Sequence, residues 1–434
     1  MVAGWWIVTV HERGRAKVGT DDAVRPPLRH NRDYAYLIAG GAVSSLGSRM
    51  SSLAFPLITL AATGSPFAVG LVAGATTMAL VLIGLPAGAL VDRWDRRRTM
   101  IAAAALGATS YLTVAIAAFA HRITVPHLML AAACGGVANS FYSPAEQVAV
   151  RHVVRRHDIP RAAVNNQVRS ATAGLAGPPI GGFLFGIARG LPMVADVISY
   201  LIAIVCTSRV RTPLPGARAE DREALLPSIR TGLRFLFGNE LLRTITLLST
   251  FLNFVGTGLV VSVTITMQQR GTDAAWIGAV SSSMALSMLV ASLLSGRLLR
   301  HLSVGVLMLL TPLIGAVAFA GMAFAQTPVL LMLLMACATF LLAPCNAAVV
   351  AVLTAKTPAD RLGRVMSADN VLSLVLTALA PAAMGFLIGT IGGREAMVIF
   401  AALLVVSGLL TLGFPRLLQL SAVSRPADGA AEAS

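Results

Sequence analysis

The sequence predicts an all-α membrane protein with twelve transmembrane helices in two pseudo-symmetric six-helix halves. Apolar residues make up 56% of the 434 positions and charged residues only 12%, whereas soluble domains average about 25% charged residues. Stretches of about 20 apolar residues, enough to cross a bilayer core of about 30 Å, recur along the chain. A motif in the fifth stretch also returns in the eleventh.

The twelve apolar stretches, numbered here as spans one to twelve, fall into two groups of six. Each is long enough to cross the hydrocarbon core as a helix. The predicted spans are 34–62, 68–91, 99–120, 124–150, 162–188 and 191–208, then 243–268, 275–299, 303–325, 328–355, 364–390 and 395–415.

The longest polar stretch between spans divides the chain into two halves. It contains Pro213, Pro215 and Pro227 together with several arginines. The apolar run at the very N-terminus precedes the first charges, which is the reverse of a secretory signal. The predicted organisation is therefore an N-terminal tail at 1–32, a half at 33–208, a linker at 209–242, a half at 243–418 and a C-terminal tail at 419–434.

An internal repeat relates span five to span eleven. Identical residues recur at a constant separation of 203 positions, which is the pattern expected when two halves are related by an axis along the membrane normal. The matched residues are Arg161, Pro178, Gly182, Phe183, Leu184 and Gly186 with Arg364, Pro381, Gly385, Phe386, Leu387 and Gly389.

The distribution of Lys and Arg predicts the orientation. With the N-terminus inside, the outer loops hold only Arg122, Arg189, Arg270 and Arg394, and all other clusters fall on the inner side. Because positive residues accumulate in cytoplasmic loops, both termini are expected in the cytoplasm, with the protein in the cytoplasmic (inner) membrane. The net charge of +15 is thus explained by topology, and no basic folded domain suggests a nucleic-acid partner.

Two motifs and a weaker third one carry a resemblance to a known family. The connection between spans two and three has Gly88, Asp92, Arg93, Arg96 and Arg97 in the pattern G-x-x-x-D-R-x-G-R-R, with Asp95 in place of the usual glycine. These residues resemble the signature loop of the major facilitator superfamily. Span five is similar to the family's antiporter motif, and Thr63-Gly-Ser-Pro between spans one and two resembles its drug and natural-product exporters of the macrolide-efflux and enterobactin-exporter type. The antiporter motif residues are Gly177, Pro178, Gly181 and Gly182, although Ala173 stands where that motif has a glycine.

The resemblance implies a secondary active transporter that exports a small, partly apolar compound by alternating access, as a proton antiporter. The compound would be a drug, an antibiotic or a secondary metabolite. A siderophore or dedicated metabolite exporter and a nutrient symporter are the alternatives. The expected partners are a small-molecule substrate, protons and the lipid bilayer, and the expected state is a monomer. Span four lacks the arginine found in many such antiporters, so their proton relay does not carry over.

Other classes find no support in the sequence. There is no G-x-x-x-x-G-K-[ST] loop for an ATP-driven pump, and no convergent set of catalytic side chains for an enzyme. We therefore expect neither an enzyme nor a cofactor. The four cysteines lie in apolar segments without the spacing of a zinc site, so no metal site is expected.

The charged loop is expected to form a cytoplasmic latch. The family resemblance implies that Asp92 faces the positive N-terminus of span eleven and that the loop arginines pair with acids at neighbouring helix ends, such as Glu146. A connection whose charges serve only topology is the alternative. Asp369, five residues inside span eleven, is either a latch partner or a solvated helix-end charge.

Charged residues inside the spans are candidates for function because they are costly in a bilayer. Counting about 1.5 Å of rise per residue puts Arg49 of span one roughly 24 Å from the inner face and Asp196 of span six roughly 9 Å from the outer face. In a core of about 30 Å these depths nearly coincide, which predicts an Arg49–Asp196 pair that is either structural or coupled to protons. Arg169 of span five is a candidate for an anionic or carbonyl-bearing substrate, or for pairing with an acid or a lipid phosphate.

Spans one, four, seven and ten would line the central cavity in this family's fold. Their middle portions carry scattered hydroxyl and amide side chains on an apolar background, which suits a bulky, partly apolar compound. Helix packing through small polar residues explains any one of them equally well. The cavity candidates are Ser48, Ser52, Asn139, Tyr142, Asn253, Thr257 and Asn346.

Overall fold

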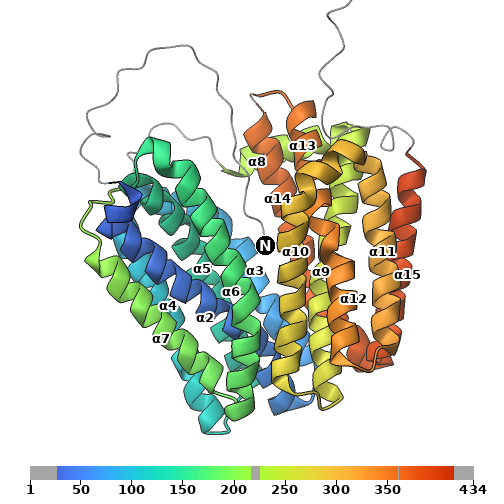
Figure 1. The fold of residues 1–434 in the computed structure, drawn as a ribbon, viewed down its shortest axis with the longest axis horizontal. Coiled ribbons are helices and arrows are strands. Elements are labelled where there is room, and N and C mark those ends of the chain that lie inside the picture. The colour runs from blue at the N-terminus through green and yellow to red at the C-terminus, as the bar shows by residue number, and fades with distance from the viewer. Residues whose placement is uncertain (1–26, 217–224, 360, 415–434) are drawn as a thin grey trace, which may run out of the picture.

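The computed structural model describes residues 27–216, 225–359 and 361–414, and it has helices at all twelve predicted places (Figure 1). Every predicted span end lies within three residues of a helix end. The elements are η1 (Leu28–His30), α2 (Arg32–Thr63), α3 (Pro66–Arg93), α4 (Arg96–Phe119), α5 (Val125–Val153), η2 (Arg156–Asp158), α6 (Ile159–Ile187), α7 (Leu191–Arg209), α8 (Leu225–Gly238), α9 (Glu240–Gln269), α10 (Ala274–His301), α11 (Val304–Phe324), α12 (Pro328–Phe340), α13 (Leu342–Lys356), α14 (Leu362–Ile391) and α15 (Gly393–Leu412).

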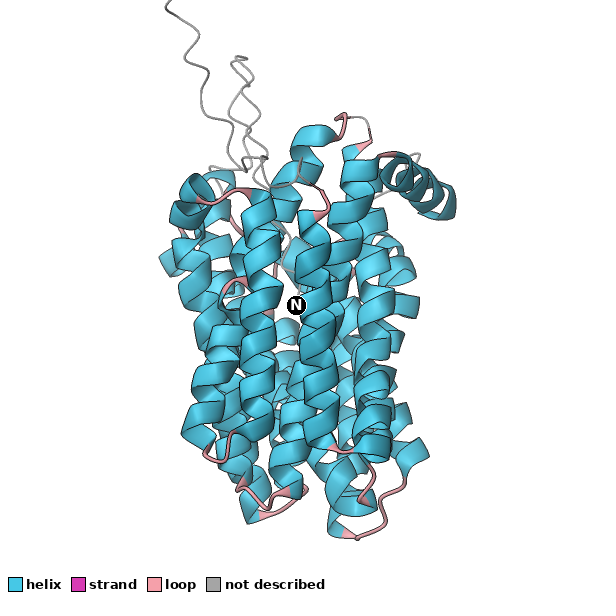
Figure 2. Ribbon diagram, turned by 90° about the vertical axis from the view of Figure 1, so that its right-hand side faces the viewer, coloured by secondary structure: helices cyan, strands magenta, loops and turns pink. Residues whose placement is uncertain are grey.

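In the described part of the chain, nine helical segments are long and apolar enough to cross a membrane, with α12 and α13 counted together. The long helices that fall short are α2, α5 and α6. These are the helices that carry Arg49, Glu146 and Arg169. The helices lie side by side along one common direction (Figure 2).

Short connections between helices are fixed by capping side chains. Gly64, with φ +65°, ends α2, and the Ser65 side chain accepts a hydrogen bond from the amide of Ala68 to begin α3. Only two residues separate α3 from α4, and the second of them is Asp95. Its carboxylate accepts a hydrogen bond from the Arg98 amide at 2.9 Å. The acid that replaces the usual glycine of the loop motif is therefore the N-cap of α4.

Span ten is a broken helix, which the sequence analysis did not predict. The break at Leu341 separates α12 from α13. Pro344 lies four residues after Phe340 and has no amide hydrogen to donate to the Phe340 carbonyl, and its ring crowds that carbonyl. The helix resumes at once, because the Cys345 amide donates to the Leu341 carbonyl at 2.9 Å.

The predicted linker region contains a helix, α8, which packs on the beginning of α14. Gly232 makes this contact possible: an added Cβ would lie 2.2 Å from the Arg364 carbonyl oxygen. The Arg361 guanidinium lies 5.9 Å from the centre of the Phe235 ring. We call the end of the molecule that holds α8 and the α3–α4 connection the linker end, and the other end the distal end (Figure 1).

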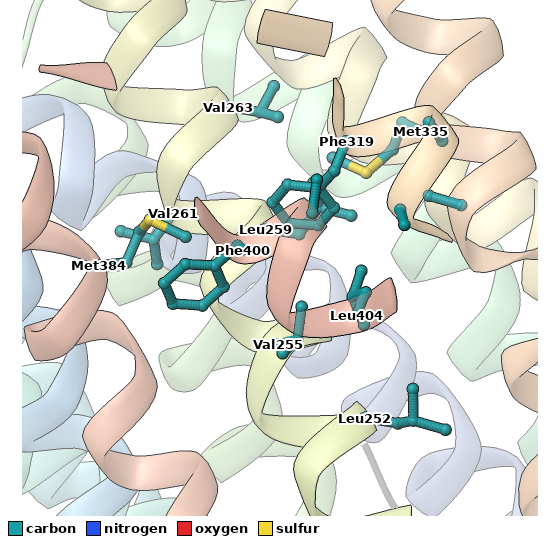
Figure 3. Close-up of a cluster of buried hydrophobic side chains, with 14 of the residues drawn as sticks. Leu252, Val255, Leu259, Val261, Val263, Phe319, Met335, Met384, Phe400 and Leu404 are labelled. Carbon is teal, nitrogen blue, oxygen red and sulfur yellow. The ribbon is translucent and has the colours of Figure 1, made fainter. Parts of the chain in front are cut away.

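The two halves have separate hydrophobic cores. Buried side chains of α2 to α7 form most of one cluster, and side chains of α9 to α15 form most of the other. In the C-terminal half, Phe400 of α15 stacks between Phe254 and Phe319 with ring centres 6.1 and 6.4 Å apart. Figure 3 shows Phe319 and Phe400 among aliphatic and methionine side chains from α9, α12, α14 and α15.

The halves meet through two equivalent contacts toward the distal end, α6 with α10 and α3 with α14. In the first, an added Cβ at Gly278 would lie 2.2 Å from the Pro178 carbonyl oxygen. In the second, an added Cβ at Gly70 would lie 2.3 Å from the Pro381 carbonyl oxygen. Because Pro178 and Pro381 are repeat partners, the two contacts obey the internal symmetry. We call this pair of contacts the glycine seam; in Figure 1 the ribbons of α6 and α10 separate from it toward the linker end.

Candidate functional site

A buried ion pair joins α5 and α6 inside the N-terminal half. Both Nη atoms of Arg169 donate to the Glu146 carboxylate, Nη1 to Oε1 and Nη2 to Oε2 at 3.0 Å. The side chains are 11% and 8% exposed, so the pair is largely withdrawn from solvent. Two-pronged contacts of this kind are the strongest geometry available to an arginine and a carboxylate. The prediction that Glu146 pairs with the loop arginines is wrong, because its two oxygens are engaged by Arg169.

Gly41 of α2 provides the space for this pair. An added Cβ at Gly41 would lie 1.8 Å from both Arg169 Nη1 and Glu146 Oε1. Tyr142, one helical turn before Glu146, is buried beside the pair. Toward the linker end, the Asn165 amide donates to the Tyr34 hydroxyl at 2.9 Å. Three helices therefore converge on one polar cluster.

Asp196 of α7 is fully buried and is held by hydroxyl groups. Ser51 of α2 donates to one carboxylate oxygen at 2.5 Å and Ser199 donates to the other at 2.7 Å. Gly47 makes room for the carboxylate, since an added Cβ there would lie 2.2 Å from Oδ1. The carboxylate thus lies against α2 at the level that depth counting predicted.

The predicted Arg49–Asp196 pair is nevertheless absent. Gly47 and Ser51 face Asp196, and at 100° per residue Arg49 points about 180° away from the midpoint between them. Depth along a helix fixes the level of a side chain but not its direction around the axis. Arg49 is half-buried on the side of α2 that meets α6.

The guanidinium of Arg49 has neither a hydrogen-bond acceptor nor a carboxylate partner among the described residues. Its backbone carbonyl accepts a hydrogen bond from the Ser52 hydroxyl at 2.8 Å. Both Ser48 and Ser52 are exposed. A cation near the middle of a long helix is thus left uncompensated beside exposed hydroxyls.

The residues of the predicted antiporter motif are contact points between helices. Gly177 and Gly181 lie against α2, where added Cβ atoms would come within 2.4 Å of the Arg49 Cβ and 2.9 Å of the Met50 Cα. Gly182 lies against α10, with the Ala274 carbonyl oxygen 2.1 Å from an added Cβ. The carbonyl of Pro178 meets Gly278 in the glycine seam. The motif therefore places α6 directly between α2 and the C-terminal half.

The structure disperses the predicted latch residues around the α3–α4 connection. An added Cβ at Gly88 would meet nothing within 4 Å. Asp92 is half-buried and Arg93 is exposed. The Arg97 side chain reaches the end of α7, and the Arg96 backbone amide donates to the Leu214 carbonyl at 3.0 Å.

Those two arginines have different surroundings. Arg97 donates to the Ser208 carbonyl. Arg96 is only 4% exposed, and its Nε and Nη1 have no hydrogen-bond partner among the described residues. The same is true of Oδ1 of Asp369 on α14. Buried polar atoms usually have a hydrogen-bond partner, so these atoms stand out among the described residues.

The predicted cavity residues divide by exposure. Asn139 and Asn346 are exposed, as are the two serines of α2, whereas Tyr142 is buried. Asn253 and Thr257 of α9 are half-buried and donate to carbonyls of their own helix, Ser249 and Asn253, each at 3.0 Å. In the part of the chain that the structure describes, no group of three or more His, Cys, Asp or Glu side chains could hold a metal ion.

Several residues of these clusters were not singled out from the sequence as partners. Gly41, Ser51, Ser199, Tyr34 and Asn165 lie on three helices and come together only in the folded bundle. For Ser51 the sequence did hold a signal: it lies four residues after Gly47, so the two residues share one face of α2.

Comparisons with known proteins agree with this architecture. The Major Facilitator Superfamily profile matches residues 37–328 and 246–430. The chain is 27% identical over 418 residues to the multidrug efflux pump Tap of Mycolicibacterium fortuitum, covering 91% of this chain and 97% of the pump. It is 24% identical to macrolide efflux protein A of Streptococcus pyogenes, over 50% of this chain and 54% of that protein.

Solved structures of transporters share the fold. A bacterial homologue of the human lysosomal transporter Spinster, in an inward-facing and unoccupied conformation, superposes with a TM-score of 0.70 at 16% identity and covers 92% of this chain and 100% of its own. The nucleoside transporter NupG has a TM-score of 0.67 at 14% identity, covering 88% and 98%. With two helical halves, the charged loop, the repeated glycine–proline contact and these matches in hand, the chain belongs to the major facilitator superfamily of transporters.

Proposed function

We propose that the protein exports a small, partly apolar compound, such as a drug, an antibiotic or a secondary metabolite, across the cytoplasmic membrane. The observation that carries this proposal is the similarity to an efflux pump over nearly the whole length of both chains. The second efflux relative, although matched over half its length, supports the same direction of transport. The exposed side chains of α2 and α5 include the hydroxyls of Ser48 and Ser52 and the amide of Asn139, which suits an amphiphilic compound.

Alternating access is supported by the way the halves touch. All the close glycine contacts between them lie toward the distal end, where α6 meets α10 and α3 meets α14. Rocking of one half against the other about a site near the middle would close the linker end and part the seam. We place the linker end, with its arginines, in the cytoplasm together with both termini, and we place all twelve predicted spans across the membrane.

The N-terminal half offers two carboxylates for proton coupling. Asp196 is fully buried, and its carboxylate accepts hydrogen bonds from the hydroxyl groups of Ser51 and Ser199. Buried acids in membrane helices commonly serve as proton relays. Glu146 is balanced by Arg169, and protonation of that acid would release the arginine. We assign proton binding to Asp196 and the conformational response to the Glu146–Arg169 pair.

The first experiment measures accumulation of a dye and antibiotic panel in an efflux-deficient bacterium that expresses the chain, with and without a protonophore. Reduced accumulation that the protonophore reverses is the expected result. Unchanged accumulation across a broad panel, followed by a difference in secreted compounds, would instead indicate a dedicated metabolite or siderophore exporter. Proton-dependent uptake of a nutrient would contradict export.

Asp196→Asn tests the coupling residue. The amide keeps the size of the side chain and can accept from Ser51, so the protein is expected to fold while protonophore-sensitive efflux is abolished. Ser199→Ala is the matched control, since it removes a neighbouring hydrogen bond and leaves the carboxylate in place. Efflux from the Asn variant at the wild-type rate, with the same protonophore response, would remove Asp196 from the mechanism.

A further inference from the structure

We infer that Arg49 binds an anionic group of the transported compound, so that the substrates are acidic or acceptor-rich amphiphiles rather than organic cations. This inference rests on the proposed export function and names the class of compound that the same pathway accepts. It follows from four features of the N-terminal half: the depth of Arg49, the engagement of the nearby acids, the direction of the side chain and the groups beside it.

The first feature is depth. Arg49 lies about 26 Å along α2 from Arg32, counting about 1.5 Å per residue. This is near the middle of α2, which runs from Arg32 to Thr63. A guanidinium in the middle of a membrane helix is costly unless it faces the interior of the bundle and meets a partner there. Desolvation of Arg49 by the surrounding chain is substantial.

The second feature is that the acids of this half are already engaged. Asp196 faces the opposite side of α2 and accepts from Ser51 and Ser199. Glu146 is held by two nitrogens of Arg169. The second mid-span arginine is therefore neutralised by its own partner, whereas Arg49 contributes a full positive charge with no acid against it among the described residues.

The third feature is the direction of the side chain. Gly177 of α6 brings the two helices close at Arg49, and an added Cβ there would lie 2.4 Å from the Arg49 Cβ. The absence of a side chain at this point lets the Arg49 stem lie against the α6 backbone. Gly177 therefore does more than pack two helices, since it fixes the position of the Arg49 stem that carries the guanidinium.

The fourth feature is the row of hydroxyls beside Arg49. Ser45 is half-buried, and Ser48 and Ser52 are exposed. Ser45 and Ser52 lie four residues before and three residues after Arg49 and share its helix face, and Ser48 is three and four residues from these two serines. A guanidinium presents five N–H donors in a planar fork that matches a carboxylate, sulfonate or phosphate, and the hydroxyls supply further donors. An organic cation would meet only like charge at this point.

The test uses two dyes with the same xanthene skeleton and opposite charge, carboxyfluorescein and tetramethylrhodamine ethyl ester. Fluorescence anisotropy measures their binding to the purified, detergent-solubilised protein. Wild type is expected to prefer the anionic dye. Arg49→Gln should bind it roughly ten- to hundredfold more weakly, the loss of one charged hydrogen-bonded contact, whereas Arg49→Lys should stay within severalfold of wild type.

Arg122→Gln is the matched control, because it removes one arginine from an exposed connection and should leave binding unchanged. Size-exclusion profiles establish that each variant is folded, and the Lys variant separates charge from side-chain shape. Preference of wild type for the cationic dye, undetectable binding of the anionic dye, or equal binding by wild type and Arg49→Gln would each overturn the inference.

Transport of the same dyes into inside-out vesicles separates the two proposals. Arg49-dependent binding without any transport would contradict export and leave the anion site standing. Export of panel compounds at equal rates by wild type and Arg49→Gln would overturn the anion site and leave export standing. Arg49-dependent transport of the anionic dye supports both.

Discussion

Both halves bury aromatic rings, but only the N-terminal half also buries charged groups among the described residues. Every charged residue that is buried in the described chain belongs to the first half: Arg96, Glu146, Asp158 and Asp196. The buried polar residues of the second half are serines and threonines. Phe400 of that half stacks between Phe254 and Phe319, and Figure 3 shows Phe319 and Phe400. The same helical architecture thus encloses two different interiors.

The difference shows which properties the repeat preserves. The contacts that join the halves follow the internal symmetry, since Pro178 and Pro381 each present a carbonyl to a glycine of the other half. The polar chemistry does not follow it: Arg169 would correspond to Leu372 at the repeat separation. Helix packing is therefore a property of both halves, whereas charge recognition and proton coupling are assigned to one.

The largest expected effect comes from breaking the Glu146–Arg169 pair. Glu146→Gln leaves a buried guanidinium uncompensated, which costs about 3–5 kcal/mol of stability, and transport should be lost. Thermal unfolding in detergent and vesicle transport are the measurements. The double variant Glu146→Leu with Arg169→Met should recover most of the stability, since apolar residues of similar size can replace a buried pair, without recovering transport. Full transport by the double variant would show that the pair serves packing alone.

An intermediate effect is expected in the C-terminal half. Leu404→Ala beside the phenylalanine stack should lower stability by about 3 kcal/mol, through the cavity that it leaves. Dye binding that depends on Arg49 should be unaffected, because the cavity lies in the other half. Leu409→Ala, at a side chain 53% exposed, is the matched control, with an expected change within about 0.5 kcal/mol. A loss of anion binding in the Leu404 variant would show that the two interiors are not independent.

The smallest effect is expected at the linker end, where the Asp33 carboxylate accepts hydrogen bonds from the chain that follows α7. Burial would raise the pKa of the Asp33 carboxyl, but hydrogen bonds from the Thr212 side chain and from the Arg211 and Thr212 amides, with the charge of Arg211, lower it below its usual value. The folded-state pKa is therefore the lower one, so the stabilisation is present above about pH 4 and is lost as the pH falls through the folded value.

Asp33→Asn should accordingly melt below wild type at neutral pH, and the difference should disappear in acid. Melting curves of both proteins across this range measure it. A difference in melting temperature that persists at low pH would show that the stabilisation by Asp33 does not depend on the carboxylate charge.

Helix positions were accessible from the sequence because apolar length determines them. Twelve apolar stretches were enough to place helix ends to within three residues. The break at Leu341 was missed because the prediction weighed apolar length over the single proline responsible, and α8 was missed because its segment was treated as linker. Both errors are local and have identifiable side chains as causes.

The candidate site was less accessible, because partners inside a bundle depend on rotation around each helix. Arg49 and Asp196 were correctly assigned to one level and incorrectly paired. Glu146 was identified as a significant acid with the wrong arginines as partners. Successive residues of a helix point about 100° apart, so a shift of one residue gives a side chain a different neighbour. The apolar pattern of a membrane helix indicates this direction less reliably than the amphipathic pattern of a helix in water does.

The glycine seam has a consequence for what can regulate the transporter. Its contacts are made by main-chain carbonyls against residues without side chains, so no ionic group needs to be separated when the seam parts. Changes in ionic strength at the distal surface should therefore leave the balance between its joined and parted forms untouched. Any sensitivity of that balance to salt must originate in the charged interior of the N-terminal half and its linker end, some distance from the contact that moves.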